Sequence, residues 1–374
     1  MQSQGDAAAS QRAYFVGLDG LRGVAAISVL ALHFPDHTFW DIVPGAYLAV
    51  DLFFVLSGFV LAHAFEQKLR DGMNWAAFMR QRIIRLYPLY VLGTGALIGL
   101  AVLNGALAGQ STPRGFVPTA VLAALFLPTV PAFSSAAPFL YPFNFPAWSL
   151  LFELFANALF ALAARWLSGR VLVLIIVLSG MLLVCSGLYF GHLNIGWSFE
   201  NWWGAIGRVL FSFFTGVGMY RLWRAGKLEK FKAPTWAVLG ALVGVFAVQA
   251  EGAARAWVDI GAALVVFPLL TALGVNARPK GFVALACAKL GAASYAVYVL
   301  QIVIIEVLSK AAPYVAGREW ASFGVAGSLA LACAVLGAGL AANAYYDGPA
   351  RRFLTRTLVD GSVISRQSAR GGVL

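Results

Sequence analysis

Long apolar segments recur along most of this 374-residue chain, and few charged residues interrupt them. Hydrophobic residues make up 60% of the sequence and charged residues 11%, so the apolar surface exceeds what a water-soluble domain can bury. A helix needs about 20 apolar residues to cross a bilayer. These segments are continuous and do not alternate, which argues against a transmembrane β-barrel. The sequence therefore predicts an all-α fold, a polytopic integral membrane helix bundle.

The apolar segments are numerous enough for about ten membrane spans. We expect these spans, with approximate ends, at 18–34, 45–65, 83–104, 147–164, 171–190, 203–220, 235–250, 257–275, 290–309 and 321–343. A shorter apolar piece at 116–127 is bracketed by prolines. We expect it to be a re-entrant or tilted segment that does not cross the membrane.

The basic residues predict the orientation. If 116–127 does not cross, most of the 27 lysines and arginines lie on the same side as the N-terminus, and Arg208 lies within a span. Cytoplasmic loops carry the excess of basic residues, so both termini are expected in the cytoplasm. This gives a cytoplasmic N-terminal tail at 1–17, a transmembrane domain at 18–343 and a basic cytoplasmic C-terminal tail at 344–374. Juxtamembrane cations that contact anionic lipid explain the net charge of +11, so we expect the lipid bilayer and no nucleic acid as a partner.

Two ionisable residues, Arg22 and His33, interrupt the first apolar segment. They are eleven residues apart, so a helix returns them to nearly the same face, about 16 Å apart along its axis. A bilayer makes such side chains costly, and they tend to face a bundle interior or a cavity and to have a function. The pair predicts a polar path with a cation toward the cytoplasm and an imidazole toward the outside.

A second polar cluster, Arg82 and Arg85, lies at the cytoplasmic end of the third span. Residues three apart share a helix face. Two guanidinium groups there can bind a phosphate, as a coenzyme or lipid headgroup would require. The simpler alternative, anchoring of the helix to anionic lipid, stays open.

Two carboxylates, Asp51 and Glu153, lie in otherwise apolar spans near their outer ends, at the depth expected for His33. Asp51 could fix the tautomer of an imidazole, or it could bridge helices as a buried hydrogen-bonding group. Glu153 needs a partner or a cavity. Ser57 and Gly58 are more typical of close helix packing than of a nucleophile. No close-spaced metal ligands occur, so we expect no metal site.

Four motifs, in this order, resemble those of the membrane-bound acyltransferase-3 family, which includes bacterial O-acetyltransferases of cell-surface glycans. They are Leu18-Asp-Gly-Leu-Arg-Gly23 followed by His33, Asp51-Leu-Phe-Phe-Val-Leu-Ser-Gly-Phe59, Arg82-Ile-Ile-Arg-Leu-Tyr-Pro88 and Trp148-Ser-Leu-Leu-Phe-Glu153. Late in the chain, Ser294-Tyr-Ala-Val-Tyr-Val-Leu300 and Tyr346-Asp-Gly-Pro-Ala-Arg-Arg352 match the closing motifs. Two departures are Gln301, where the family often has histidine, and Asp347, where it often has glutamate. We assign no proton transfer to Gln301.

The resemblance implies an enzyme, a membrane acyltransferase of the bacterial cytoplasmic membrane. Its donor substrate would be cytoplasmic acyl-CoA, usually acetyl-CoA, with no cofactor bound permanently. Its acceptor would be a hydroxyl of a cell-surface or exported carbohydrate or glycolipid. The arginine-x10-histidine motif of the family matches Arg22 and His33, and its R-x-x-R motif matches Arg82 and Arg85.

These observations lead to one mechanistic hypothesis. The coenzyme phosphates would be held by arginines, namely Arg22, Arg82 and Arg85. His33 would act as a general base on the acceptor hydroxyl or carry the acyl group as a nucleophile, while Asp51 and Glu153 orient the imidazole or the acceptor. A transporter or flippase of a polar solute or lipid-linked glycan is the alternative. It predicts broken helices in matching halves, and no convincing pair is found.

Overall fold

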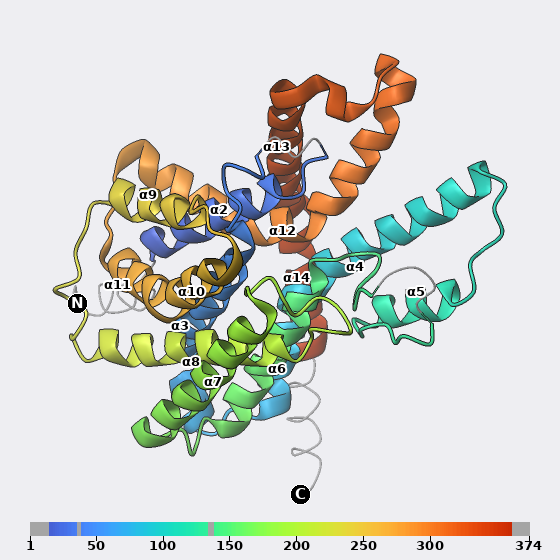
Figure 1. Ribbon diagram of the computed structural model, residues 1–374. Coiled ribbons are helices and arrows are strands. Elements are labelled where there is room, and N and C mark those ends of the chain that lie inside the picture. The colour runs from blue at the N-terminus through green and yellow to red at the C-terminus, as the bar shows by residue number, and fades with distance from the viewer. Residues whose placement is uncertain (1–14, 36–38, 134–137, 361–374) are drawn as a thin grey trace, which may run out of the picture.

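The computed structural model describes residues 15–35, 39–133 and 138–360 and shows a bundle of helices that cross at varied angles (Figure 1). The expected all-α class is confirmed. The elements in chain order are α2 (Val16–Ala31), η1 (Ala46–Leu48), α3 (Ala49–Arg70), α4 (Trp75–Leu107), α5 (Phe116–Ala124), α6 (Ala147–Ala163), α7 (Gly169–Phe190), α8 (Gly204–Arg224), α9 (Thr235–Phe246), α10 (Gly252–Gly261), η2 (Ala262–Val266), α11 (Phe267–Asn276), α12 (Gly281–Ala316), η3 (Trp320–Phe323), α13 (Gly324–Ala341), η4 (Ala342–Asp347), α14 (Gly348–Thr355) and η5 (Arg356–Asp360).

Each of the ten apolar segments expected from the sequence falls in a helix or a continuous run of helices. Among the described residues, six such stretches are long and apolar enough to cross a membrane, namely Ala46–Arg70, Trp75–Leu107, Gly169–Phe190, Gly252–Asn276, Gly281–Ala316 and Trp320–Leu358. α6 and α9 are apolar but have only 17 and 12 residues. Several helices of spanning length indicate a multi-pass membrane protein, whereas the predicted count of ten spans is not confirmed.

The predicted tails lie partly outside the described residues, which exclude 1–14 and 361–374. Helical structure continues past the expected boundary at residue 343, because η4, α14 and η5 follow α13 without a break. η4 and η5 are π-helical turns. Such turns often occur at functional sites in helices.

The segment expected at 116–127 forms the short helix α5. Its nine residues extend about 14 Å, which is well below the ~30 Å of a bilayer core. Gly115 precedes α5 with φ +81°, and a β-carbon there would lie 2.0 Å from the carbonyl oxygen of Phe133. The chain that leaves α5 therefore returns to its start. The hydroxyl groups of Tyr87 and Tyr90 donate to carbonyl groups at the end of α5, which ties it to α4 (Figure 1).

The centre of the bundle depends on close contact between α3 and α8. A β-carbon on Gly58 would lie 1.9 Å from the carbonyl oxygen of Phe213, and one on Gly216 would lie 2.1 Å from that of Val55. Small residues let helix backbones approach in this way inside membranes. The packing interpretation of Gly58 agrees with this geometry. α2 packs in the same central region against α12, so the helices that carry most of the polar motif residues lie together (Figure 1).

We expect Gly58→Val to destabilise the protein by about 1–3 kcal/mol, since the added side chain meets backbone that cannot move aside. The measurement is thermal unfolding of the purified protein in detergent. Gly99→Val is the matched control, because Gly99 also lies in a long helix and a β-carbon added to it would have no neighbour within 4 Å. Equal losses in the two variants would contradict the close-contact interpretation.

Candidate active site

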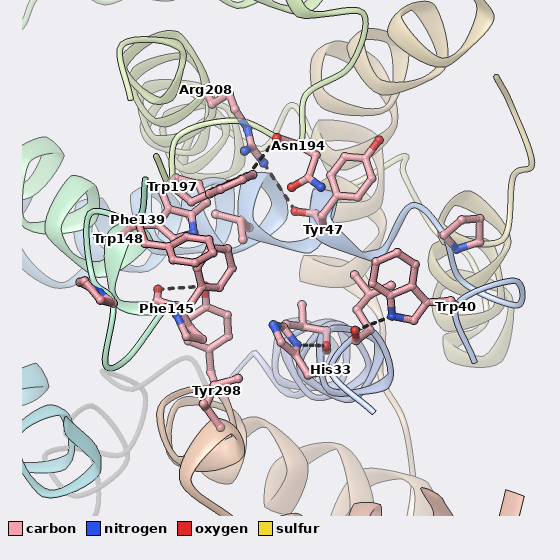
Figure 2. Close-up of a pocket in the computed structure, with 17 residues that line it drawn as sticks. His33, Trp40, Tyr47, Phe139, Phe145, Trp148, Asn194, Trp197, Arg208 and Tyr298 are labelled. Atoms are coloured by element: carbon pink, nitrogen blue, oxygen red, sulfur yellow. Dashed lines mark hydrogen bonds between the residues drawn. The ribbon is translucent and has the colours of Figure 1, made fainter. Parts of the chain in front are cut away.

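A cavity of about 570 Å³ lies between the end of α2, the start of α3, α8 and the loops before α6 and after α7 (Figure 2). Its walls are mostly aromatic, and His33, Asn194 and Arg208 supply polar groups. The aromatic residues are Trp40, Tyr47, Phe139, Phe145, Trp148, Trp197 and Tyr298. A largely apolar cavity with a few convergent polar groups is the usual form of a small-molecule site.

His33 faces this cavity from the turn that follows α2 (Figure 2). Its Nδ1 lies 2.7 Å from the carbonyl oxygen of Val29. A carbonyl oxygen only accepts hydrogen bonds, so Nδ1 must carry the proton and donate it. The lone pair is then on Nε2. A backbone carbonyl, and neither predicted carboxylate, therefore sets the tautomer of this imidazole.

Two loops form the aromatic wall opposite His33. An antiparallel bridge pairs Phe139 with Ser198. The amide of Leu140 donates to the carbonyl oxygen of Trp197 at 2.9 Å, and the amide of Phe199 donates to that of Pro138 at 2.8 Å. Figure 2 shows the rings of Phe139, Phe145 and Trp197 gathered on this side. Backbone pairing thus satisfies the polar groups of irregular loops beside an apolar cavity.

Asp51 forms a buried ion pair with Arg208. Both oxygens of its carboxylate accept hydrogen bonds from that guanidinium group, from Nε at 3.1 Å and from Nη2 at 2.6 Å. The side chains are 0% and 1% exposed. Arg208 also donates to the carbonyl oxygen of Ile195 at 2.6 Å. Of the two roles open to Asp51 from the sequence, the contact seen is the bridge between helices.

A second buried carboxylate, Asp259, supports the same wall from α10. It accepts hydrogen bonds from the hydroxyl group of Tyr47 at 2.6 Å and from the amide of Leu193 at 2.8 Å. Arg255 pairs with its other oxygen. Tyr47 is therefore fixed at its hydroxyl group, and its carbonyl oxygen lies 3.5 Å from Nη2 of Arg208. Two ion pairs, Asp51–Arg208 and Asp259–Arg255, therefore support the cavity wall.

A second, narrow cavity of about 70 Å³ has Arg22 among its lining residues. The two cavities share Val50 and Tyr298 as lining residues, so they are neighbours in the bundle. The hydroxyl group of Tyr298 lies 2.8 Å from that of Ser149, which lines the narrow cavity. His33 and Arg22 therefore line two neighbouring cavities.

Glu153 and Ser57 line the narrow cavity and contact each other. One carboxylate oxygen of Glu153 accepts a hydrogen bond from the hydroxyl group of Ser57 at 2.7 Å and from Nη2 of Arg82 at 3.2 Å. Both charged side chains are mostly buried, at 18% and 14% exposure. The partner that Glu153 requires is thus Arg82, and the pair joins α6 to α4.

Arg85 pairs with a different carboxylate, Asp347 at the end of η4. The two groups are 3.5 Å apart, and Asp347 also forms an ion pair with Arg351 at 2.6 Å. Asp347 is fully buried, whereas Arg85 is 30% exposed. The guanidinium group of Arg85 lies 5.0 Å from the ring centre of Tyr295, a residue that lines the narrow cavity. Aspartate at position 347, where the family often has glutamate, therefore still forms an ion pair with Arg85.

The structure joins some of the predicted residues and separates others. Arg22 and Glu153 line one cavity and His33 lines the next. Asp51 and Glu153 each pair with an arginine, Glu153 also accepts a hydrogen bond from Ser57, and in the described chain neither carboxylate bonds to His33. Sequence reasoning missed Arg208 as a site residue. The signal was available, because an arginine inside an apolar span needs a buried partner just as Arg22 does.

Residues 15–339 match the profile of the acyltransferase-3 family, described as an acyltransferase domain. The chain belongs to the acyltransferase-3 family. The protein is therefore a membrane acyltransferase, and the transporter alternative is not favoured. No solved structure matches the chain.

Three curated relatives are similar to parts of the chain. Protein 2 in the picA locus of Rhizobium radiobacter is 36% identical over 192 residues, which cover 47% of this chain and 96% of that protein. Acyltransferase MdmB of Streptomyces mycarofaciens is 32% identical over 152 residues, 35% of this chain and 38% of that protein. Exopolysaccharide production protein ExoZ of Rhizobium meliloti is 35% identical over 112 residues, 30% of this chain and 32% of that protein. The latter two alignments thus span only about a third of each relative.

We expect Asp51→Leu to destabilise the protein by about 3–5 kcal/mol, because it leaves the guanidinium group of Arg208 buried without a counter-charge. The double variant Asp51→Leu, Arg208→Met should lose less stability than the single variant, since no unpaired charge is left buried. Thermal unfolding in detergent measures both. A single variant that keeps full stability and loses only transfer activity would instead identify Asp51 as a catalytic residue.

Proposed function

We propose that this protein transfers an acyl group, in particular acetyl, from cytoplasmic acyl-CoA to a hydroxyl group of a cell-surface or exported carbohydrate. The observation that carries the proposal is a pair of neighbouring cavities. One is lined by Arg22 and the other by His33, and both are lined by Val50 and Tyr298. A donor that binds at the arginine end can present its thioester to the imidazole.

The donor is expected to extend through the narrow cavity. Arg22, Arg82 and Arg85 would hold the coenzyme diphosphate by charge-assisted hydrogen bonds. The spacing of about 16 Å between Arg22 and His33 along a helix suits a long and thin pantetheine arm.

The chemistry is expected at Nε2 of His33, which has its lone pair free. Nε2 would take the proton of the acceptor hydroxyl group as its oxygen attacks the thioester carbonyl carbon. The tetrahedral intermediate then collapses, the carbon–sulfur bond breaks, and the coenzyme thiolate takes the proton back from Nε2. The imidazole ends the cycle as it began it, with its other nitrogen bonded to Val29.

The carboxylates Asp51 and Glu153 act in this proposal as positioning residues. Asp51 would hold Arg208 and thereby the cavity wall near the acceptor. Glu153 would hold Arg82 beside the donor arm. Both roles use the ion pairs described above and require no proton transfer by either group.

The acceptor is expected in the larger cavity. Flat aromatic faces bury the apolar faces of sugar rings, while Asn194 and His33 can hydrogen-bond to hydroxyl groups. The name of the relative ExoZ refers to exopolysaccharide production, which supports a carbohydrate acceptor. The loop charges support a location in the bacterial cytoplasmic membrane with both termini in the cytoplasm.

His33→Ala is expected to lower acetyl transfer by 10²-fold or more, because a general base contributes about 10²–10⁴ to a rate. The measurement is acetyl content of surface carbohydrate, by mass spectrometry, in a deletion strain that expresses each variant. His63→Ala is the matched control, since His63 lies in α3 away from both cavities.

Retained acetylation in His33→Ala would exclude His33 as the base. Incubation of purified protein with acetyl-CoA and no acceptor separates the two roles of the imidazole. A stable mass increase of one acetyl group on His33 would exclude the general-base route and favour a covalent carrier.

A further inference from the structure

A basic groove of about 480 Å³ lies along α14, outside both cavities. It is lined by Gly348, Arg351, Arg352, Thr355 and Arg356. These residues recur at helical spacing, so they form one face of α14 and η5. The proposed reaction assigns no role to this face.

Two of the three arginines in the groove are not neutralised by the protein. Arg351 is paired with the buried Asp347. Arg352 and Arg356 are exposed and form no ion pair with any residue in the part of the chain that the structure describes. The paired N–H groups of a guanidinium match the oxygens of a phosphate group, as they match those of a carboxylate. The groove therefore has the chemistry of a phosphate site.

A chain of contacts links the groove to the narrow cavity. α14 packs against α4, and Nη1 of Arg80 donates to the carbonyl oxygen of Leu358 in η5 at 2.5 Å. Asp347 links Arg351 in the groove to Arg85. Arg85 in turn lies on the ring of Tyr295, which lines the narrow cavity. The groove is therefore near the arginines to which the proposed function assigns the coenzyme diphosphate.

We propose that Arg352 and Arg356 in this groove bind the 3′-phosphate of the coenzyme A donor. The inference rests on the proposed function and deepens it. Coenzyme A carries this phosphate at the end farthest from its thioester. With the diphosphate at Arg22, Arg82 and Arg85, that end lies beyond Arg85, where α14 begins. Recognition of the 3′-phosphate would select coenzyme A over pantetheine thioesters that lack the nucleotide.

The same chemistry could serve the phosphate of an anionic lipid headgroup, so the test separates the two sources. The measurement is the affinity, by calorimetry, of purified protein in phosphatidylcholine nanodiscs for two ligands. These are coenzyme A and dephospho-coenzyme A, which lacks the 3′-phosphate. We expect wild type to prefer coenzyme A by at least about tenfold, because hydrogen bonds between charged groups contribute that much. Arg352→Gln with Arg356→Gln should abolish this preference and leave the affinity for dephospho-coenzyme A unchanged.

The matched control is Arg165→Gln with Arg170→Gln, which removes two exposed arginines, one from the loop after α6 and one from the first turn of α7. It should keep the preference for coenzyme A. A groove variant that also keeps it would overturn the proposal. Added phosphatidylglycerol provides the test for lipid binding. If it stabilises wild type against heat but not a groove variant that keeps its preference for coenzyme A, the groove binds lipid and the proposal is wrong.

Failure of this inference is distinguishable from failure of the proposed function. If the groove variant keeps its preference while His33→Ala loses acetyl transfer, the groove assignment is wrong and the function stands. If wild type binds neither form of the coenzyme and transfers no acetyl group, both are wrong.

Discussion

The buried ion pair between Asp51 and Arg208 is the constraint on which the rest of the site depends. Neither charge is stable alone in an apolar interior, so each fixes the position of the other. The pair joins α3 to α8 where glycines already bring their backbones together. Arg208 uses its remaining donors on the carbonyl groups of Ile195 and Tyr47. One interaction therefore sets both a helix contact and the shape of the larger cavity.

The paired arginines differ in how much of each remains available to a ligand. Arg208 is 1% exposed and its donors are used within the protein. Arg85 is paired with a fully buried carboxylate but is itself 30% exposed, and Arg22 is 35% exposed. A guanidinium group with an exposed edge beside a cavity can bind a further anion through its free N–H groups without breaking its ion pair. This distinction separates the arginines that build the fold from those that can bind a donor.

The sequence predicted the features that depend on local pattern. Continuous apolar segments gave the helices, and Arg22 and His33, eleven residues apart, line two neighbouring cavities. The partners of Arg82, Arg85 and Asp51 could not be predicted, because sequence does not show which helices touch. The tautomer of His33 also depends on a backbone carbonyl one turn earlier, and residue types carry no signal for that. The number of spans stays a prediction, since α2, α6 and α9 are short and α8, with 21 residues, is not among the helices apolar enough to cross a membrane.

The unequal sizes of the two cavities have a chemical consequence for the proposed reaction. A thioester is open to hydrolysis, so water must be kept from it until the acceptor arrives. The narrow cavity, when filled by an extended donor arm, has little room for solvent, and the larger one has mostly aromatic walls. Tyr298 lies at their junction with its hydroxyl group held by Ser149. An acceptor in the larger cavity would displace water from His33 as it binds, and it would reach the thioester near Val50 and Tyr298, which line both cavities. Acyl transfer to a hydroxyl group would then be favoured over hydrolysis, because the donor fills the narrow cavity first and the acceptor then displaces water from the larger one.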